Sequence, residues 1–295
     1  MRTVGIYHKV DLDGYCSGAI IKKKYPYAEL IGWSYGDPIP ELSECKVVMA
    51  DISFPPDIMD TFSRENEVLW IDHHKSAIEA FEEYYGNGGE GEDKDIPFDF
   101  VLDKSFAACE LTWKTLFKGG QMPIAVKLLG TYDAWRDADK NYWDSYVMPF
   151  QFGMRMQCTS PETFNFLYLD PTTIDFIKAI ISVGETILKY QGVQDEQLSK
   201  KAAFEHEIMG LKAICINGAN QNSSSFDSVY DPTKHDVMVP FRFDGTGWNF
   251  SMYSTKEDVD CSYYAKAFGG GGHAGAAGFR VEDLTEIFGD KIKWK

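Results

Sequence analysis

Residues 3–14, TVGIYHKVDLDG, join a short apolar run to a polar segment that contains one histidine and two aspartates. Most residues of the run are β-branched, apolar or aromatic, which favours a strand over residues 3–7. Residues 18–24, GAIIKKK, are compatible with a helix, and their lysines suit the negative end of its dipole. The stretch therefore predicts a strand that ends in polar side chains just before a helix.

Strand-like and helix-like segments continue to alternate along the first hundred residues. Short apolar runs at residues 30–35, 46–49, 68–71 and 98–102 resemble further strands, with helix-compatible segments between the first pairs. Such alternation indicates βαβ units and hence a mostly parallel sheet with flanking helices. The fold class that we expect is α/β.

A second change of pattern divides the chain into two domains, as its 295 residues lead us to expect. Residues 104–190 have a mainly helical pattern, whereas strand-like runs return from residue 211 onward. We therefore expect a first domain at residues 1–190, a connector at 191–210 and a smaller α/β domain at 211–295.

The smaller domain contains a hairpin signal followed by a run of glycines. Residues 236–243 and 248–254 resemble two strands that are joined through Asp244-Gly245. A helix over residues 261–268 then leads into the stretch GGGGHAGAAG, residues 269–278.

The charge balance, 45 acidic against 29 basic residues, gives a formal net charge of −16. This charge argues against binding of long duplex nucleic acid, since such binding needs a broad basic surface. It does not exclude a small phosphorylated substrate held by a local site or by metal ions. Residues 86–95 form a glycine-rich acidic stretch, which predicts a surface loop rather than a calcium site because the ordered ligand spacing is missing.

Several features predict a cytoplasmic protein without a membrane span. Residues 1–9 lack the long apolar region of a signal peptide, and no apolar run approaches the ~18 residues of a membrane span. The six cysteines are scattered without a C-x-x-C pair, which favours free buried thiols over a disulfide frame or a zinc site.

Polar side chains follow three of the predicted strands at the point where each strand ends. The first strand is followed by His8, Asp11 and Asp13, the third by Asp51, and the fourth by Asp72, His73 and His74. Because ligands collect at the carboxyl ends of parallel strands, we expect these side chains to converge on one edge of the sheet. Carboxylates so close together repel one another, and divalent ions such as manganese or magnesium, which suit carboxylate and imidazole ligands, would relieve that repulsion.

Each of these residues alone has a simpler interpretation. An aspartate after a strand, such as Asp51, is typical of a helix N-cap, and Asp13-Gly14 is typical of a turn. Adjacent His73 and His74 could be a coincidence on the surface. These interpretations explain poorly why such residues recur at successive strand ends, and we therefore predict a metal site.

In this arrangement the sequence resembles the DHH phosphoesterase superfamily with its DHH-associated C-terminal domain, in particular the nanoRNase or oligoribonuclease-like branch. Asp72-His73-His74 is the naming motif. His8 with Asp11-Leu12-Asp13-Gly14 is similar to the first motif, Asp51 to the second, and Asp133 in TYDAWR to the fourth. The stretch GGGGH with AAGF after it resembles the signature of the C-terminal domain, so the resemblance covers essentially the whole chain in the right order.

The resemblance implies a site for two divalent ions, typically manganese, with magnesium or cobalt as alternatives. His8 and Asp11 would hold one ion, Asp13, His73 and Asp133 would hold the other, and Asp51 would bridge them. His74 would face the substrate as a phosphate ligand or proton donor, and Asp72 would orient a histidine. A two-metal site of this kind activates water for an in-line displacement at phosphorus.

The resemblance also implies an active site in the cleft between the domains, where Gly270, Gly271, Gly272 and His273 grip the terminal phosphate of the substrate. Glycines in a row allow backbone N–H groups to face a phosphate without obstruction by Cβ atoms. Tyr253 stands where many relatives have an arginine. Arg136 and Lys75 are candidate replacement cations for substrate binding, although each could equally form a surface salt bridge.

These observations predict a manganese-dependent phosphodiesterase that hydrolyses short oligonucleotides, or linear or cyclic dinucleotides, to mononucleotides. The alternative enzyme is a phosphatase of 3′-phosphoadenosine 5′-phosphate, or a hydrolase of another small phosphoester or polyphosphate. The alternative of another class is a nucleotide sensor that binds without hydrolysis. The expected partners therefore include a short nucleotide substrate but neither long duplex nucleic acid nor a membrane, and a homodimer is left open.

Overall fold

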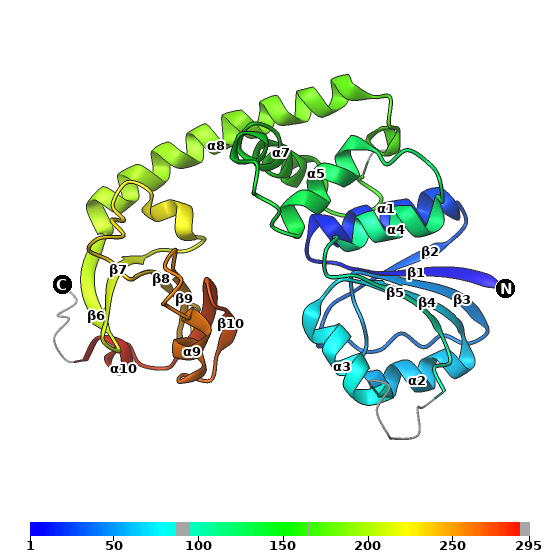
Figure 1. Ribbon diagram of the computed structural model, residues 1–295, viewed down its shortest axis with the longest axis horizontal. Helices are drawn as coiled ribbons and strands as arrows, with labels where there is room; N and C mark the ends of the chain where they lie inside the picture. Colours follow the sequence, from blue (N-terminus) through cyan, green and yellow to red (C-terminus); the bar gives the residue numbers. More distant parts are fainter. Residues whose placement is uncertain (87–94, 165, 290–295) are drawn as a thin grey trace. The chain divides into compact units, whose positions relative to one another are not determined.

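The computed structural model describes residues 1–86, 95–164 and 166–289. The chain divides into two compact units, Met1–Leu188 and Lys189–Lys295, each built on its own sheet (Figure 1). Of the acidic stretch for which we predicted a surface loop, residues 87–94 lie outside the described residues.

The sheet of the first unit has five parallel strands in the order β2-β1-β3-β4-β5. These strands are β1 (Arg2–His8), β2 (Glu29–Trp33), β3 (Cys45–Ala50), β4 (Glu67–Asp72) and β5 (Asp99–Leu102). The predicted parallel α/β sheet is thus confirmed. Since β1, β3 and β4 are neighbours, the three strands that were predicted to end in polar residues do so side by side.

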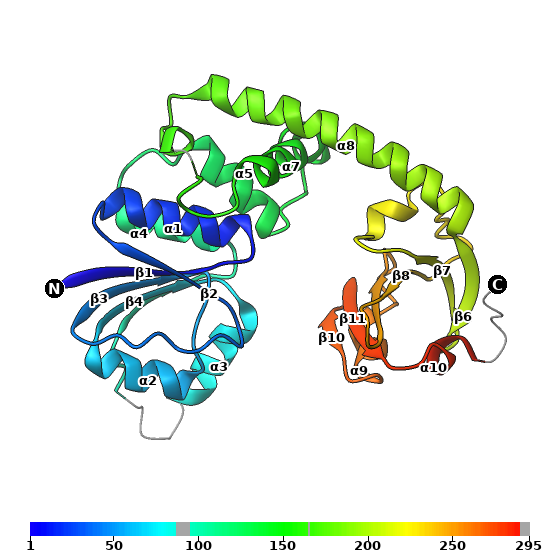
Figure 2. The ribbon, with the colours of Figure 1, turned by 180° about the vertical axis from the view of Figure 1, so that it is seen from behind.

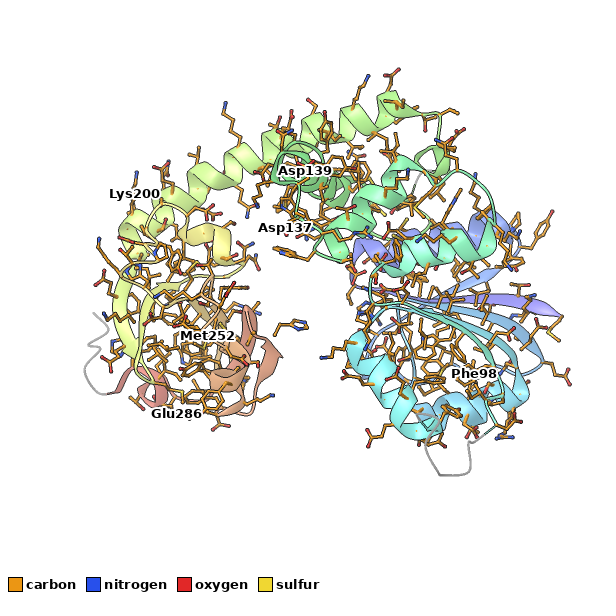
Figure 3. All side chains as sticks on the ribbon, in the orientation of Figure 1. Phe98, Asp137, Asp139, Lys200, Met252 and Glu286 are labelled. Atoms are coloured by element: carbon orange, nitrogen blue, oxygen red, sulfur yellow. The ribbon has the colours of Figure 1, made fainter. Side chains whose placement is uncertain are left out.

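Helices cover both faces of this sheet (Figures 1 and 2). One face packs against α1 (Leu12–Lys24) and α4 (Ala108–Leu116), and the other packs against α2 (Pro56–Glu65) and α3 (Lys75–Tyr85). Burial on both sides explains why β3, CKVVMA, is apolar at almost every position instead of alternating. Figure 3 shows the labelled Phe98 in the side-chain layer between the sheet and the helices α2 and α3.

The rest of the first unit is helical, as the pattern of residues 104–190 predicts. It contains α5 (Ile124–Asp133), α6 (Lys140–Tyr142), η1 (Trp143–Val147), α7 (Met148–Gln157), η2 (Phe166–Leu169) and the start of α8 (Ile174–Ala202). The boundary between the two units lies within α8. None of the helices in the described parts of the chain is both long and apolar enough to cross a membrane.

The second unit has a mixed six-stranded sheet in the order β10-β11-β9-β8-β7-β6. Its elements are β6 (Phe204–Ile208), β7 (Leu211–Asn217), η3 (Ser223–Phe226), β8 (Val237–Phe243), β9 (Trp248–Tyr253), α9 (Cys261–Lys266), β10 (Gly271–His273), β11 (Ala276–Val281) and α10 (Thr285–Phe288). The predicted hairpin is present as β8 and β9, whose turn is closed by the Asp244 side chain, which accepts hydrogen bonds from the N–H groups of Thr246 and Gly247.

We expected a connector at residues 191–210, and these residues contain regular secondary structure. Residues 191–202 continue α8, and β6 is hydrogen-bonded to β7 as the edge strand of the second sheet. The polar character of this stretch reflects the exposed side of a helix and an edge strand, whose side chains alternate between solvent and the sheet.

Candidate metal centre

The end of β1 and the first turn of α1 hold three of the predicted ligands. Asp11 is the N-cap of α1, and its side chain accepts a hydrogen bond of 2.9 Å from the N–H of Gly14. A Cβ atom at Gly14 would lie 2.0 Å from the carbonyl oxygen of His8, so only glycine lets the helix begin this close to the strand. The close approach leaves Asp11 Oδ2 3.1 Å from His8 Nδ1.

Asp13 lies in the first turn of the same helix and is buried. Both of its carboxylate oxygens accept backbone hydrogen bonds, from Ala108 at 2.9 Å and from Cys109 at 2.8 Å. These N–H groups belong to the first turn of α4, whose positive end favours a carboxylate. Asp13-Gly14 is typical of a turn in the sequence, but Asp13 is a buried carboxylate that links α1 to α4.

Asp51 follows β3 in a backbone conformation that few residues other than glycine adopt, with a φ of +66°. Aspartate tolerates this region of φ better than most residues do. Backbone strain of this kind is typical of functional sites. The turn points the two carboxylate oxygens toward different partners: Oδ1 lies 3.4 Å from His73 Nε2, and Oδ2 lies 3.7 Å from His8 Nδ1. This is the arrangement that a bridging ligand requires.

Asp72 ends β4 and organises the two histidines that follow it. Its Oδ1 accepts hydrogen bonds from the N–H groups of His73 and His74 and lies 2.7 Å from His74 Nδ1. Its Oδ2 accepts a hydrogen bond from Trp70 Nε1 at 3.2 Å. Asp72 is fully buried, so it cannot reach a substrate and instead fixes the orientation of the His74 ring.

His73 is the meeting point of carboxylates from three separate elements. Its Nε2 lies 3.6 Å from Asp13 Oδ2 in α1, 3.4 Å from Asp51 Oδ1 and 3.2 Å from Asp133 Oδ2 at the end of α5. The structure thus brings all the predicted ligands together, including Asp133, which lies sixty residues after the naming motif in the sequence.

The buried donor atoms of this cluster fit divalent metal ions. His8 Nδ1, Asp51 Oδ2 and His73 Nε2 are buried and have no hydrogen-bond partner among the described residues, although buried polar atoms are normally paired. Three groups of residues place their donor atoms within 4.8 Å of one another: His8, Asp11 and Asp51; Asp13, His73 and Asp133; and Asp51, His73 and His74. Oxygen and imidazole donors without thiolates suit manganese or magnesium.

The raised pKa values of three carboxyl groups in the cluster indicate that a nearby cation would stabilise their charged forms. Burial, together with the neighbouring Asp51, raises the pKa of Asp13 to about 8. Burial also raises the pKa of Asp51 to about 8 and, with the charge of Asp13, the pKa of Asp133 to about 7. Three carboxyl groups whose pKa values lie this far above the ordinary range resist ionisation together unless a cation compensates them.

The two histidines beside these carboxyls are shifted in the same direction. Burial lowers the pKa of His8, but the carboxylates of Asp11 and Asp51 outweigh burial and raise it to about 10. Burial likewise lowers the pKa of His74, and Asp72 outweighs it and raises the pKa to about 9. The Asp72 carboxylate therefore favours the protonated form of His74.

Arg136, which we predicted as a substrate-binding cation, is engaged within the protein. Its guanidinium contacts Glu110 Oε2 at 2.8 Å, Thr131 Oγ1 at 3.4 Å and the carbonyl oxygen of Ser105 at 3.2 Å. Glu110 is buried in α4 and also accepts a hydrogen bond from the N–H of Ala107. The ion pair links the start of α4, which holds Asp13, to the end of α5, which holds Asp133.

Removing this ion pair is expected to destabilise the fold. The substitution Arg136→Met should lower the free energy of unfolding by about 2–3 kcal/mol, because it leaves a buried carboxylate without its partner, while partial exposure of the arginine moderates the effect. Glu110→Gln in the same chain should restore part of this loss, as urea unfolding would measure. A rise in KM with unchanged stability would instead support substrate contact by Arg136.

Trp70 and Glu110 are two residues of this region that sequence reasoning missed. Alternation along β4 places Trp70 on the same side as Asp72, two residues later, which was the available signal for their contact. For Glu110 the signal was a single acidic residue within the apolar helix ACELTWKTL. Such a residue, when buried, needs a partner.

The glycine-rich run of the second unit, whose N–H groups we expected to face a phosphate, forms some of its hydrogen bonds within the protein. The N–H groups of Gly269 and Gly270 donate to the carbonyl oxygens of Lys266 and Ala265 at the end of α9. Gly271–His273 form the edge strand β10, paired with β11. Gly271–His273 pair with β11 because the chain reverses direction at Ala274-Gly275, so that β10 and β11 form a hairpin.

His273 and Tyr253 lie in register on either side of Ala276 in β11. His273 is exposed, whereas Tyr253 is half-buried and packs against a core cluster that contains Met238. The structure therefore brings these two predicted substrate contacts to the same end of the second sheet.

No protein-family model matches the chain. A curated relative, an uncharacterized protein of Acanthamoeba polyphaga mimivirus, is 25% identical over 277 residues, which cover 84% of this chain and 59% of the relative. The chain thus spans less than two thirds of the length of the curated relative that it matches.

Solved structures that resemble the chain include a pGpG-specific phosphodiesterase of Vibrio cholerae, at 12% identity and a TM-score of 0.41, covering 97% of this chain and 94% of that chain. The DHH domain of a member of a ribosomal-protein family matches at 11% identity and a TM-score of 0.47, covering 94% of this chain and 82% of that chain. Because both TM-scores are below 0.5, the assignment of function depends on the residues of this chain.

Proposed function

We propose that this chain, which has the motifs of the DHH phosphoesterase superfamily, is a metal-dependent hydrolase of phosphoesters. The observation that carries the proposal is the set of buried ligand atoms of His8, Asp51 and His73 that have no hydrogen-bond partner in the described parts of the chain, close to Asp11, Asp13 and Asp133. Asp13 and Asp51 are buried, and buried carboxylates beside further carboxyl groups are stable in the charged form only when cations compensate them.

In this proposal, different residues of the cluster have different roles in hydrolysis. Divalent cations held by this cluster would supply Lewis-acid activation of water and neutralise charge on the phosphate. Asp51 orients two sets of ligands through its two oxygens. Asp72 holds Nδ1 of His74, which leaves the other ring nitrogen to donate a proton to the oxygen that leaves phosphorus.

The finer form of the proposal is a manganese-dependent phosphodiesterase for short substrates, namely short oligonucleotides or linear or cyclic dinucleotides. The motifs support it through their resemblance to nanoRNases. The net charge of −16 disfavours long duplex nucleic acid. Gly271, Gly272, His273 and Tyr253 of the second unit are proposed contacts to the substrate phosphate, and Gly271 and His273 are exposed on an edge strand. Gly270 is left out, because its N–H donates to the carbonyl oxygen of Ala265.

A substrate panel tests this function directly. The protein with manganese, magnesium or cobalt would be incubated with pApA, pGpG, longer RNA, cyclic dinucleotides and 3′-phosphoadenosine 5′-phosphate, and products would be separated by chromatography. We expect release of mononucleotides from the dinucleotides, which a chelator abolishes. Hydrolysis of 3′-phosphoadenosine 5′-phosphate alone would identify a phosphatase instead, and no hydrolysis of any substrate with any metal would refute the enzyme assignment.

A further inference from the structure

Trp135 occupies a backbone position that ordinarily belongs to glycine. It follows the C-terminal end of α5 with a φ of +49°, the left-handed conformation in which helices commonly end. The N–H of Trp135 donates to the carbonyl oxygen of Tyr132 at 3.1 Å, and the N–H of Arg136 donates to that of Thr131 at 3.0 Å. These two bonds complete a Schellman motif, in which a bulky residue at this φ is an outlier.

Packing alone does not account for a tryptophan at this position. The side chain is 65% exposed, whereas Trp143 beside it is buried in the core of the first unit. The centroids of these two rings are 5.1 Å apart, and Trp143 is itself stacked on Tyr132 at 5.6 Å. Trp143 and the partly buried Tyr132 therefore support the Trp135 ring from one side, while most of its surface faces solvent.

The backbone at Trp135 is anchored next to the candidate metal centre. Trp135 is two residues after Asp133, whose Oδ2 lies 3.2 Å from His73 Nε2. On its other side the chain is anchored through Arg136 to the buried Glu110. Because Asp133 and Arg136 are both held by contacts, the backbone that carries this exposed aromatic ring is anchored close in sequence to a predicted ligand.

We propose that Trp135 is a stacking platform for a nucleobase of the substrate, a proposal that rests on the phosphoester hydrolase function proposed above. An exposed indole attached to a fixed backbone stacks on planar heteroaromatic rings. Every nucleobase presents such a surface, so this contact favours nucleotides over base-free phosphoesters without selecting one base. The backbone strain at Trp135 is then retained for binding, as strain at functional sites commonly is.

The substitution Trp135→Gly separates binding from stability. Calorimetry with manganese present would measure the Kd of adenosine 5′-monophosphate and of ribose 5-phosphate, which lacks the base. We expect the substitution to raise the Kd of the nucleotide about tenfold, because one stacked base is lost, and to leave the Kd of ribose 5-phosphate unchanged. Because glycine relieves the strain and the ring is mostly exposed, Tm should stay within about 2 °C of the wild-type value or rise.

Met209→Gly is the matched control. Met209 has a φ of +51° and is 48% exposed, but it lies in the turn between β6 and β7 of the second unit. Its substitution should affect Tm similarly and change neither Kd. Trp135→Asn provides a second test, since asparagine tolerates a positive φ but cannot stack, and we expect it to weaken nucleotide binding to the same extent.

An unchanged nucleotide Kd in Trp135→Gly or Trp135→Asn would overturn the proposal, as would an equal loss of affinity for both ligands or the absence of nucleotide binding by the wild-type protein. A fall in Tm of about 10 °C in both variants would also overturn it, because the ring would then be a core residue. These outcomes are separable from the substrate panel. Hydrolysis without the stacking effect removes only the role of Trp135, and the stacking effect without hydrolysis leaves a nucleotide-binding site that is not an enzyme.

Discussion

Asp51→Asn is expected to lower kcat for a dinucleotide by about 10³-fold or more while the protein remains folded. The carboxylate approaches both His73 and His8 with different oxygens, so losing its charge weakens every ligand set to which it contributes. Asparagine has nearly the same shape and also tolerates the φ of +66°. The measurement is steady-state hydrolysis at saturating manganese, together with manganese affinity from calorimetry.

The same substitution should make the metal-free protein more resistant to unfolding at alkaline pH. Asp51 is 1% exposed, and burial raises its pKa to about 8. Above that pH the wild-type protein must bury a charge that asparagine does not have. Asp175→Asn is the matched control, because Asp175 is an exposed carboxylate in α8 far from the cluster, and it should change neither activity nor stability. Full turnover by Asp51→Asn would disprove the bridging role.

Metal-free protein is expected to lose stability as pH rises from about 4 to about 10, first through the carboxyl groups and above about pH 6.5 also through the histidines, and manganese is expected to reverse that loss. The folded-state pKa values of Asp13, Asp51 and Asp133 are raised to about 8, 8 and 7, and those of His8 and His74 to about 10 and 9. A group whose pKa is raised on folding stabilises the fold fully below its unfolded pKa, about 4 for aspartate and about 6.5 for histidine, and this contribution is lost as pH rises from that value to the folded pKa.

Two other carboxyl groups act in the opposite direction, but in a different range of pH. Contacts with His8 and with the N–H of Gly14 outweigh burial and lower the pKa of Asp11, and contacts with His74 do the same for Asp72. Their contribution to stability is present above the ordinary aspartate range and is lost only as pH falls below it. The alkaline loss is therefore attributable to the groups with raised pKa values.

Manganese at about 100 times its Kd should stabilise the fold by about 2.7 kcal/mol at pH 8 and release protons into a weakly buffered solution. Urea unfolding between pH 6 and pH 9.5, with a chelator or with manganese, measures the first effect, and a pH electrode measures the second. In Asp51→Asn both effects should be smaller. Stability of the metal-free protein that increases with pH above 7, or that manganese leaves unchanged, would contradict a metal centre at this cluster.

The fold of the first unit and the composition of its candidate site were predictable because they follow from local patterns. Apolar runs mark the strands, and the carboxyl ends of parallel strands necessarily lie along one edge of a sheet. His8, Asp51 and Asp72 therefore had to approach one another once β1, β3 and β4 were neighbours. Asp133 belongs to a helix and has no such constraint, so only its resemblance to a family motif identified it.

Other features depended on contacts that no local pattern contains. Arg136 was a candidate cation for substrate binding that could equally form a surface salt bridge, and its partner Glu110 lies 26 residues earlier in another helix. The N–H groups of the glycine run were expected to face a phosphate, but the last part of the run pairs with a strand that lies beyond it in the sequence. In both cases the hydrogen-bond partners were determined by another segment of the chain that folding brings into contact.

By itself, the sequence determined the parallel α/β architecture, the order of the motifs and the types of residue at the strand ends, because hydrophobic periodicity and side-chain chemistry are properties of short segments. Only the tertiary structure decided the partners: the two oxygens of Asp51 directed to different histidines, Asp72 held between Trp70 and His74, and Trp135 exposed in a strained turn beside Asp133. Distances and backbone angles of this kind arise from the packing of elements remote in sequence, and a few ångströms of difference in that packing separate a surface charge from a metal ligand.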